Sequence, residues 1–189
     1  KTFNLDAKVN HEVVKILADE HKVVVKNVKT GEEFEDSYDY LILSPGAEAI
    51  RPASIKNIDA KNVFVIKNVQ DIRDLDAFLE ANDVKDICVV GGGFIGVEAA
   101  ECLKHSGKNV TLVEAANQIM APFDYDMVQM LHKELYDNKV ELILSDSVTE
   151  ITPEEVVLKS GRRVKAQVVI MAIGVTPDVA FARESGVKI

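Results

Sequence analysis

The chain has 189 residues, 47% of them apolar, so it can bury the core of one domain and carry part of a second. Its 22 Lys and Arg against 31 Asp and Glu give a net charge of -9, which argues against nucleic acid and anionic membranes as partners. No apolar run is long enough to span a bilayer, and no secretory signal pattern begins the chain, so we expect a cytoplasmic protein.

The first part of the chain predicts a β-meander that feeds one buried strand. Residues 13–17 and 22–26 are rich in β-branched side chains, and the apolar run 38–43 predicts a further strand. That strand ends at Ser44-Pro45-Gly46, and the proline and glycine content up to about residue 58 indicates a linker. We therefore expect a domain boundary in this region.

From residue 63 onward the pattern changes to alternating strands and helices. The expected strands cover residues 63–66, 86–90, 110–114, 140–144 and 168–172, the expected helices cover 69–81, 94–105 and 124–138, and a short meander covers 148–164. Strands separated by helices of ten or more residues imply right-handed crossovers and a parallel sheet. The predicted fold class is therefore α/β, a Rossmann-like parallel sheet with a β-meander.

The two cysteines and four histidines do not form a metal-ligand pattern. Cys88 and Cys102 show no C-x-x-C spacing. We expect Cys88 in an apolar strand and Cys102 on the inner face of a helix, where a cysteine acts as a small hydrophobic residue. The histidines are scattered, so no metal site is expected.

A glycine-rich segment joins a predicted strand to a predicted helix and reads Val89-Val90-Gly91-Gly92-Gly93-Phe94-Ile95-Gly96. In this G-x-G-x-x-G spacing, Gly91 permits a tight turn, Gly93 lets the backbone approach a pyrophosphate, and Gly96 lets the helix pack close to the sheet. The start of the helix offers free N–H groups and the positive end of its dipole to the phosphates. The spacing alone is a weak signal, but the strand-turn-helix context predicts dinucleotide binding.

Glu114 is expected to select the dinucleotide. It ends the expected strand 110–114, which follows the helix after the glycine-rich segment. It lies 18 residues after Gly96, close to the roughly 20 expected for the acid that binds a ribose 2′-OH. A carboxylate there repels a 2′-phosphate, and residues 115–118 include no arginine, so we predict a preference for NADH over NADPH. FAD binds similar turns, so the motif alone does not choose between the two dinucleotides.

The order of these motifs resembles the NADH oxidase, NADH peroxidase and coenzyme A disulfide reductase branch of the pyridine nucleotide-disulfide oxidoreductases, over essentially the whole chain. In that family an NAD-binding domain interrupts an FAD-binding domain. Residues 38–47 resemble the outgoing crossing, which implies that Ser44 and Gly46 lie by the flavin. Residues 172–177 resemble the returning crossing, which implies that Gly174 lies near the nicotinamide.

The resemblance also implies a division of the chain and roles for three further side chains. Residues 1–58 and 175–189 would belong to the FAD-binding domain, and residues 59–174 would form the NAD(H)-binding domain. Phe94, where most members carry Tyr, would cover the nicotinamide pocket. Glu98 would lie near the nicotinamide and flavin, or would simply be a solvated helix residue. The residues 117–124 resemble the loop under the adenine, where Phe123 would stack on the base or pack into the core.

The function implied by the resemblance is hydride transfer from NADH to FAD and on to a cysteine or disulfide. Coenzyme A disulfide or polysulfide is the favoured acceptor, with peroxide or oxygen as alternatives, and the full-length protein would be a homodimer. The family's FAD fingerprint and reactive cysteine do not occur in these residues, so we expect a piece of a longer enzyme that is inactive alone. The alternative is a stand-alone NADH-binding sensor module, against which the two crossing motifs argue.

Overall fold

A computed structural model describes residues 5–188. Residues 1–4 and residue 189, which the sequence assigns to the flanking segments, lie outside the described part. The chain forms two compact units, one made of residues 5–47 with 177–188 and the other of residues 48–176. Each unit has its own core.

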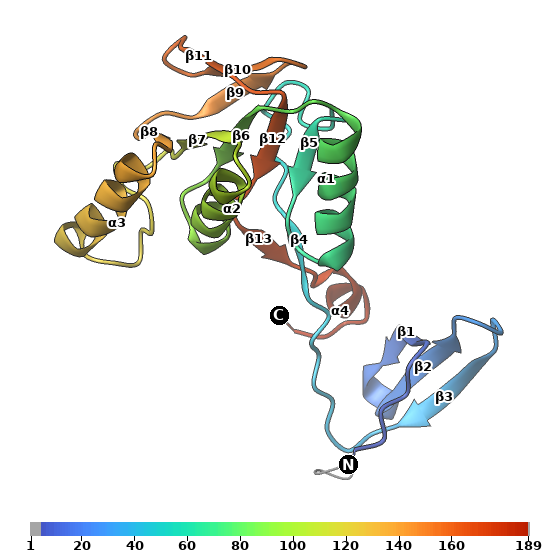
Figure 1. Cartoon of the computed structure of the whole chain (residues 1–189). Helices are drawn as coiled ribbons and strands as arrows, with labels where there is room; N and C mark the ends of the chain where they lie inside the picture. Colours follow the sequence, from blue (N-terminus) through green and yellow to red (C-terminus); the bar gives the residue numbers. More distant parts are fainter. Residues whose placement is uncertain (1–4, 189) are drawn as a thin grey trace. The chain divides into compact units, whose positions relative to one another are not determined.

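The larger unit is built on a five-stranded parallel sheet with the order β5-β12-β6-β7-β8 (Figure 1). The strands are β5 (Val63–Val65), β6 (Asp86–Val90), β7 (Asn109–Val113), β8 (Glu141–Ile143) and β12 (Val168–Met171). The helices between them are α1 (Val69–Ala81), α2 (Phe94–His105) and α3 (Tyr125–Asp137). The predicted α/β, Rossmann-like fold class is confirmed, and the predicted bounds of α1, α2 and β6 agree with the structure.

Alternation along the strands gives the sheet two buried faces. In β6, Ile87 and Val89 join a cluster with Leu103 of α2 and Val128 of α3. The intervening Cys88 and Val90 join the opposite cluster, which includes side chains of the antiparallel sheet β11-β10-β9. Those three strands are β9 (Val148–Ile151), β10 (Glu155–Leu158) and β11 (Arg163–Lys165). The predicted meander therefore covers one face of the parallel sheet, and the helices cover the other.

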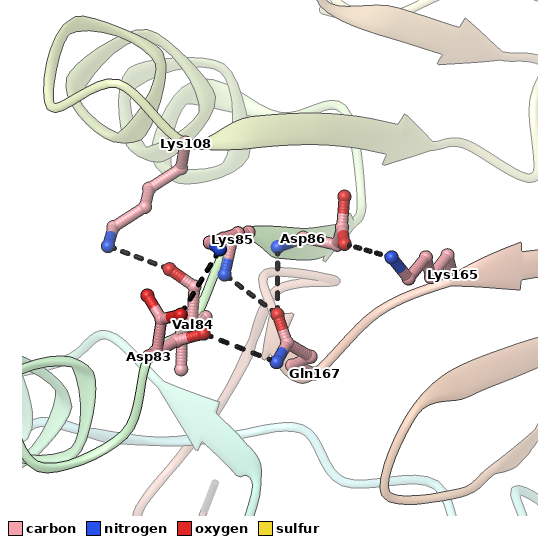
Figure 2. Close-up of polar contacts among 7 residues, drawn as sticks. All are labelled: Asp83, Val84, Lys85, Asp86, Lys108, Lys165 and Gln167. Carbon is pink, nitrogen blue, oxygen red and sulfur yellow. Dashed lines mark hydrogen bonds and ion pairs between the residues drawn. The ribbon is translucent and has the colours of Figure 1, made fainter.

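The amino ends of β6 and β12 are joined through the side chain of Gln167 (Figure 2). Its Oε1 accepts from the backbone N–H of Lys85 at 2.7 Å and of Asp86 at 3.2 Å, and its Nε2 donates to the carbonyl of Asp83 at 3.4 Å. Lys165 pairs with Asp86 at 2.9 Å, and this hydrogen bond holds the pKa of Asp86 below its usual value. The glycine turn lies at the other end of β6.

The smaller unit contains the antiparallel sheet β1-β2-β3. The strands are β1 (His11–Leu17), β2 (Lys22–Asn27) and β3 (Glu33–Ser37), with a 3-10 turn at Ala18–Glu20. Its core is Ile16, Val23 and Val25, against which Phe181, from α4 (Ala180–Glu184), and Val187 pack. The first two predicted strands are confirmed. The sequence missed β3, because its charged side chains do not show the pattern of a buried strand.

The predicted buried strand at residues 38–43 is wrong. The segment has no strand structure, and Tyr40 and Ile42 are 94% and 89% exposed. A run of apolar residues indicates β propensity, but a strand forms only where a neighbour satisfies its backbone, and no described strand pairs with this segment. A short sheet forms instead between β4 (Ala47–Ala49) and β13 (Val175–Pro177).

The two cysteines differ in their environment. Cys88 is fully buried in β6, as predicted. Cys102 is exposed, so its expected place on the inner face of α2 is wrong. The inner stripe of α2 is Gly96, Ala99, Ala100 and Leu103, and a residue one position before Leu103 is rotated by about 100° away from it.

Two further observations concern the described residues 5–188. None of the helices there is both long and apolar enough to cross a membrane. Within the same residues, no group of three or more His, Cys, Asp or Glu side chains is arranged to hold a metal ion.

Candidate functional site

The glycine turn follows β6 at the carboxyl edge of the parallel sheet, beside β12. The strand that leads into the glycine turn, β6, has β7 and β8 on one side and β12 on the other, so the direction of chain progression reverses there. In open parallel sheets, ligands bind in the crevice at such a reversal. The fold thus places the segment 91–96 where a dinucleotide site is expected.

Gly91 and Gly96 are required by contacts within the chain. Gly91 has a φ of +107°, and a Cβ on it would lie 2.5 Å from the carbonyl oxygen of Ala172 at the end of β12. A Cβ on Gly96 would lie only 1.9 Å from the carbonyl oxygen of Gly91. Both distances are far inside van der Waals contact, so these glycines let the turn, the start of α2 and β12 approach one another.

Gly92 is required by a different neighbour. A Cβ on Gly92 would lie 2.6 Å from Cγ2 of Ile119 and 3.2 Å from Oε2 of Glu114. The carbonyl of Gly92 also accepts a 2.7 Å hydrogen bond from the backbone N–H of Met120. The loop after β7 therefore packs directly on the glycine turn and fixes its position.

Gly93 differs from the other three glycines because no contact within the chain requires a glycine at this position. Its φ of -78° and ψ of -174° are accessible to any residue, and a Cβ there would meet no atom within 4 Å. Gly93 lines a cavity, so the missing side chain leaves open space at the N-terminus of α2. This open surface fits a phosphate group that must approach the backbone closely.

The first turn of α2 provides donors next to Gly93. Gly93 is the N-cap residue, and no side chain of the described residues caps this helix. Phe94 and Ile95, the first two helical residues, are 63% and 42% exposed. The backbone N–H groups of a first turn have no partner within the helix, and the dipole adds a partial positive charge, so this end of α2 can bind an anion.

Glu114 comes directly after β7 and is tied to the turn. Its Oε2 accepts a 2.6 Å hydrogen bond from the N–H of Gly92, and its Oε1 accepts one of 2.7 Å from the N–H of Ala116. These two bonds fix the side chain. Each carboxylate oxygen can accept a second hydrogen bond, so Glu114 retains acceptor capacity for hydroxyl groups in the cavity.

One cavity of about 470 Å³ brings the turn and Glu114 together. Its described lining consists of residues from the carboxyl edge of the sheet and the loops that follow it: Ile55, Val90, Gly91, Gly92, Gly93, Phe94, Val113, Glu114, Ala115, Gln118, Met120, Ala121, Pro122, Asp146, Ser147, Val148, Ala172 and Ile173. None of these residues is Lys, Arg or His. The cavity is therefore mostly apolar with two carboxylates. Such a lining suits an uncharged ring and a ribose diol better than a ribose that carries a phosphate.

The remaining candidate residues lie outside this lining. The rings of Phe94 and Phe123 meet edge to face with centroids 6.1 Å apart, although the sequence assigns them to opposite ends of a dinucleotide. Glu98 is exposed on α2. Gly174, with a φ of +112°, accepts a 3.1 Å hydrogen bond from the N–H of Ile50.

Ser44 and Gly46 belong to the smaller unit. Both are exposed, and the carbonyl of Gly46 accepts a 3.0 Å hydrogen bond from the N–H of Asp178. The structure thus brings Gly91, Gly92, Gly93, Phe94 and Glu114 together on one cavity, with Ile95 and Gly96 in the same helix start.

Sequence reasoning missed Asp146 as part of this cavity, whereas residues 120–122 belong to the segment 117–124 that the resemblance places under the adenine. Asp146 lies three residues beyond β8, at the same edge of the sheet as Glu114. The available signal was the position after a parallel strand, since the carboxyl ends of all such strands meet at one edge.

Comparisons with known proteins identify the family of the chain. A family model described as pyridine nucleotide-disulphide oxidoreductase matches residues 1–189. Coenzyme A disulfide reductase of Staphylococcus aureus strain NCTC 8325 is 33% identical over 185 residues, which are 98% of this chain and 41% of that protein. The chain thus spans about two-fifths of the length of the curated relatives it matches.

Solved structures are also similar to this chain over nearly its whole length. The reduced CoADR-RHD of Bacillus anthracis is 42% identical with a TM-score of 0.88, over 98% of this chain and 34% of that one. An NAD-dependent persulfide reductase of A. fulgidus is 27% identical with a TM-score of 0.85, over 95% and 33%. The water-forming NADH oxidase of Lactobacillus brevis, bound to NADH, is 28% identical with a TM-score of 0.78, over 93% and 39%.

Proposed function

Because the chain belongs to the pyridine nucleotide-disulfide oxidoreductase family, we propose that residues 59–174 are the NAD(H)-binding domain of such an enzyme. Residues 1–58 and 175–189 would be segments of its FAD-binding domain. The observation that carries the proposal is the open surface of Gly93, which shares one cavity with the carboxylate of Glu114. A phosphate site and a ribose site on one wall are what a dinucleotide requires.

In this proposal the protein holds the nucleotide through three features. The pyrophosphate approaches the backbone at Gly93 and accepts hydrogen bonds from the N–H groups that begin α2. The adenine ribose donates its hydroxyl hydrogens to Glu114, whose orientation is fixed by Gly92 and Ala116. The apolar loop at residues 120–122 covers the adjoining part of the cavity and excludes water. The absence of a cation from the described lining supports a preference for NADH over NADPH.

At the other end of the nucleotide, Phe94, Glu98 and Gly174 would lie near the nicotinamide, with Ser44 and Gly46 beside the flavin. NADH supplies a hydride and FAD accepts it and passes the electrons on. The role of Phe94 is to shield the pocket from water. Phe123 would stack on the adenine, and its ring lies edge to face with that of Phe94 in this structure.

The proposed acceptor is a disulfide. Relatives named coenzyme A disulfide reductase and persulfide reductase support coenzyme A disulfide or a polysulfide, and the NADH oxidase supports oxygen, or peroxide, as the alternative. This activity, and the homodimer that goes with it, are proposed for the whole protein of which the chain represents about two-fifths.

The test is calorimetric titration of the 189-residue chain with NADH and with NADPH, for the wild type, Glu114→Gln and Glu114→Ala. We expect wild type to bind NADH more tightly, and both variants to lose about tenfold in NADH affinity with a smaller loss for NADPH, because a hydrogen bond to a charged group is removed. Glu101→Gln, an exposed change outside the cavity on α2, is the matched control. Equal affinities of wild type and Glu114→Ala for NADH would contradict the assignment of Glu114.

A further inference from the structure

The carboxylate of Asp146 lines the same cavity as that of Glu114 but comes from the next strand of the sheet. The two residues are neighbours through the backbone, because the N–H of Asp146 lies 3.3 Å from the carbonyl oxygen of Glu114. One residue earlier, the N–H of Ser145 donates to the carbonyl of Ala116 at 2.8 Å. The segment after β8 is therefore fastened beside the segment after β7.

Asp146 is held in one orientation by three hydrogen bonds. Its Oδ2 accepts from the hydroxyl of Ser160 at 2.5 Å, and its Oδ1 accepts from the backbone N–H groups of Ser147 at 2.9 Å and Ser160 at 3.2 Å. All three donors favour the ionised form, and the Ser160 hydroxyl in particular keeps the pKa of Asp146 below its usual value. Asp146 is half-buried, so its charge is screened less than that of an exposed carboxylate.

We infer that Asp146 is a second determinant of the choice of NADH over NADPH at this site. The inference rests on the proposed function, in which the adenosine end of the nucleotide occupies the part of the cavity beside Glu114. A 2′-phosphate there meets two fixed carboxylates, while the described lining offers no Lys, Arg or His to neutralise it. An unphosphorylated ribose meets no such repulsion.

The two carboxylates act on the nucleotide through different interactions. Glu114 acts on the ribose through short hydrogen bonds, and its own removal also weakens NADH binding. Asp146 acts on a phosphate through charge alone, which reaches over several ångströms in a half-buried site. The two residues are thus separable, because neutralising Asp146 relieves phosphate repulsion without removing the acid assigned to the ribose.

The test is titration of the 189-residue chain with NADH and NADPH, in wild type and Asp146→Asn. Asparagine keeps the shape and can retain the backbone hydrogen bonds, so the change removes the charge and the oxygen that accepts from the Ser160 hydroxyl. We expect the ratio of NADPH to NADH dissociation constants to fall about tenfold at about 0.01 M ionic strength, and by much less at about 0.5 M, where the charge is screened. Adenosine 2′,5′-bisphosphate and 5′-AMP, measured in parallel, confine the same comparison to the adenosine end.

Two control variants isolate the charge of Asp146. Asp76→Asn makes the same change on the exposed face of α1, outside the cavity, and should leave the ratio as in wild type. Ser160→Ala removes one hydrogen bond to Asp146 but keeps its charge, so discrimination should persist.

The outcomes separate this inference from the proposed function. If wild type prefers NADH and Asp146→Asn leaves the ratio within twofold at low ionic strength, Asp146 is not a determinant while the NADH site stands. If wild type binds neither nucleotide, the proposed function and the role of Asp146 fail together. If wild type binds both equally, the dinucleotide site stands and the role of Asp146 fails. Thermal unfolding of each variant verifies that every comparison is made between folded proteins.

Discussion

The backbone N–H of Ile119 donates a 3.3 Å hydrogen bond to Nε2 of His132 inside the core of the larger unit. His132 lies on α3 and is only 5% exposed. Because Nε2 is the acceptor, the ring is neutral and carries its proton on Nδ1. Ile119 packs against Gly92, so this buried histidine supports the loop that fixes the glycine turn.

This contact predicts a loss of stability at mildly acidic pH. Burial lowers the pKa of His132 below its ordinary value. The unfolded chain therefore takes up a proton at a higher pH than the folded chain, and the free energy of unfolding rises with pH in that interval. The contribution of His132 is complete above the unfolded pKa of about 6.5, and it is lost as the pH falls toward the lower folded value.

Urea unfolding of wild type and His132→Gln across this interval is the measurement. At neutral pH we expect the variant to be less stable by about 1 to 3 kcal/mol, because a buried donor and its packing are disturbed. That difference should shrink as the pH is lowered, since only the wild type has a buried imidazole to protonate. His105→Gln, an exposed change at the end of α2, should show no such convergence. A constant difference between wild type and His132→Gln would contradict the argument.

The sequence predicted the larger unit well because its signals are local. The bounds of α1, β6 and α2 follow from apolar periodicity and from the glycine turn, and Gly91, Gly92, Gly93 and Glu114 do share one cavity. The segment 38–43 was predicted wrongly, because β propensity does not say whether a partner strand is present. The place of Cys102 on α2 was predicted wrongly, because one step along a helix changes the face.

Long-range contacts account for what the sequence did not reveal. His132 reaches the backbone of Ile119 across 13 residues, and Ser160 holds Asp146 across 14. Neither pair has a motif of its own. They become neighbours only when the ends of β7 and β8, the middle of α3 and the β10–β11 turn are brought together by the sheet.

The two cysteines should react very differently with a thiol reagent. Cys88 is fully buried, and burial raises the pKa of its thiol to about 12, so both access and the thiolate form are disfavoured. Cys102 is exposed on α2. We expect a disulfide reagent to modify one thiol in the native chain and a second only in denaturant, and Cys102→Ser to abolish the native reaction. Rapid native modification of Cys102→Ser would show that Cys88 is accessible.

The side chain of Gln167 predicts a stabilising role far from the glycine turn (Figure 2). Gln167→Leu removes the acceptor for the N–H groups of Lys85 and Asp86, and we expect a loss of about 1 to 2 kcal/mol in the free energy of unfolding. Gln167→Glu keeps an acceptor oxygen for these N–H groups, although it loses the donor to Asp83 and gains a negative charge, so its loss should be smaller. Chemical unfolding measures both, and equal losses would contradict the role given to the acceptor.

Gly93 and Gly96 form a matched pair that separates binding from folding. A Cβ on Gly96 would lie 1.9 Å from the carbonyl oxygen of Gly91, so Gly96→Ala must push the start of α2 away from the turn. We expect a loss of about 2 to 4 kcal/mol in the free energy of unfolding, as for other overpacked or strained sites. Thermal or urea unfolding measures this loss, and nucleotide binding should fall with it.

Gly93→Ala should behave in the opposite way. Its φ of -78° suits alanine, and the new Cβ would meet no atom of the chain within 4 Å, so the free energy of unfolding should change by less than about 0.5 kcal/mol. That methyl group would nevertheless occupy the space through which the pyrophosphate approaches the backbone. NADH affinity should therefore fall by about tenfold or more, which corresponds to a loss of at least about 1.4 kcal/mol in binding free energy. Calorimetric titration and unfolding of the same preparation give both values. If Gly93→Ala binds NADH as wild type does, the open surface at Gly93 is not a phosphate site, because a methyl group in such a site would keep the pyrophosphate away from the backbone.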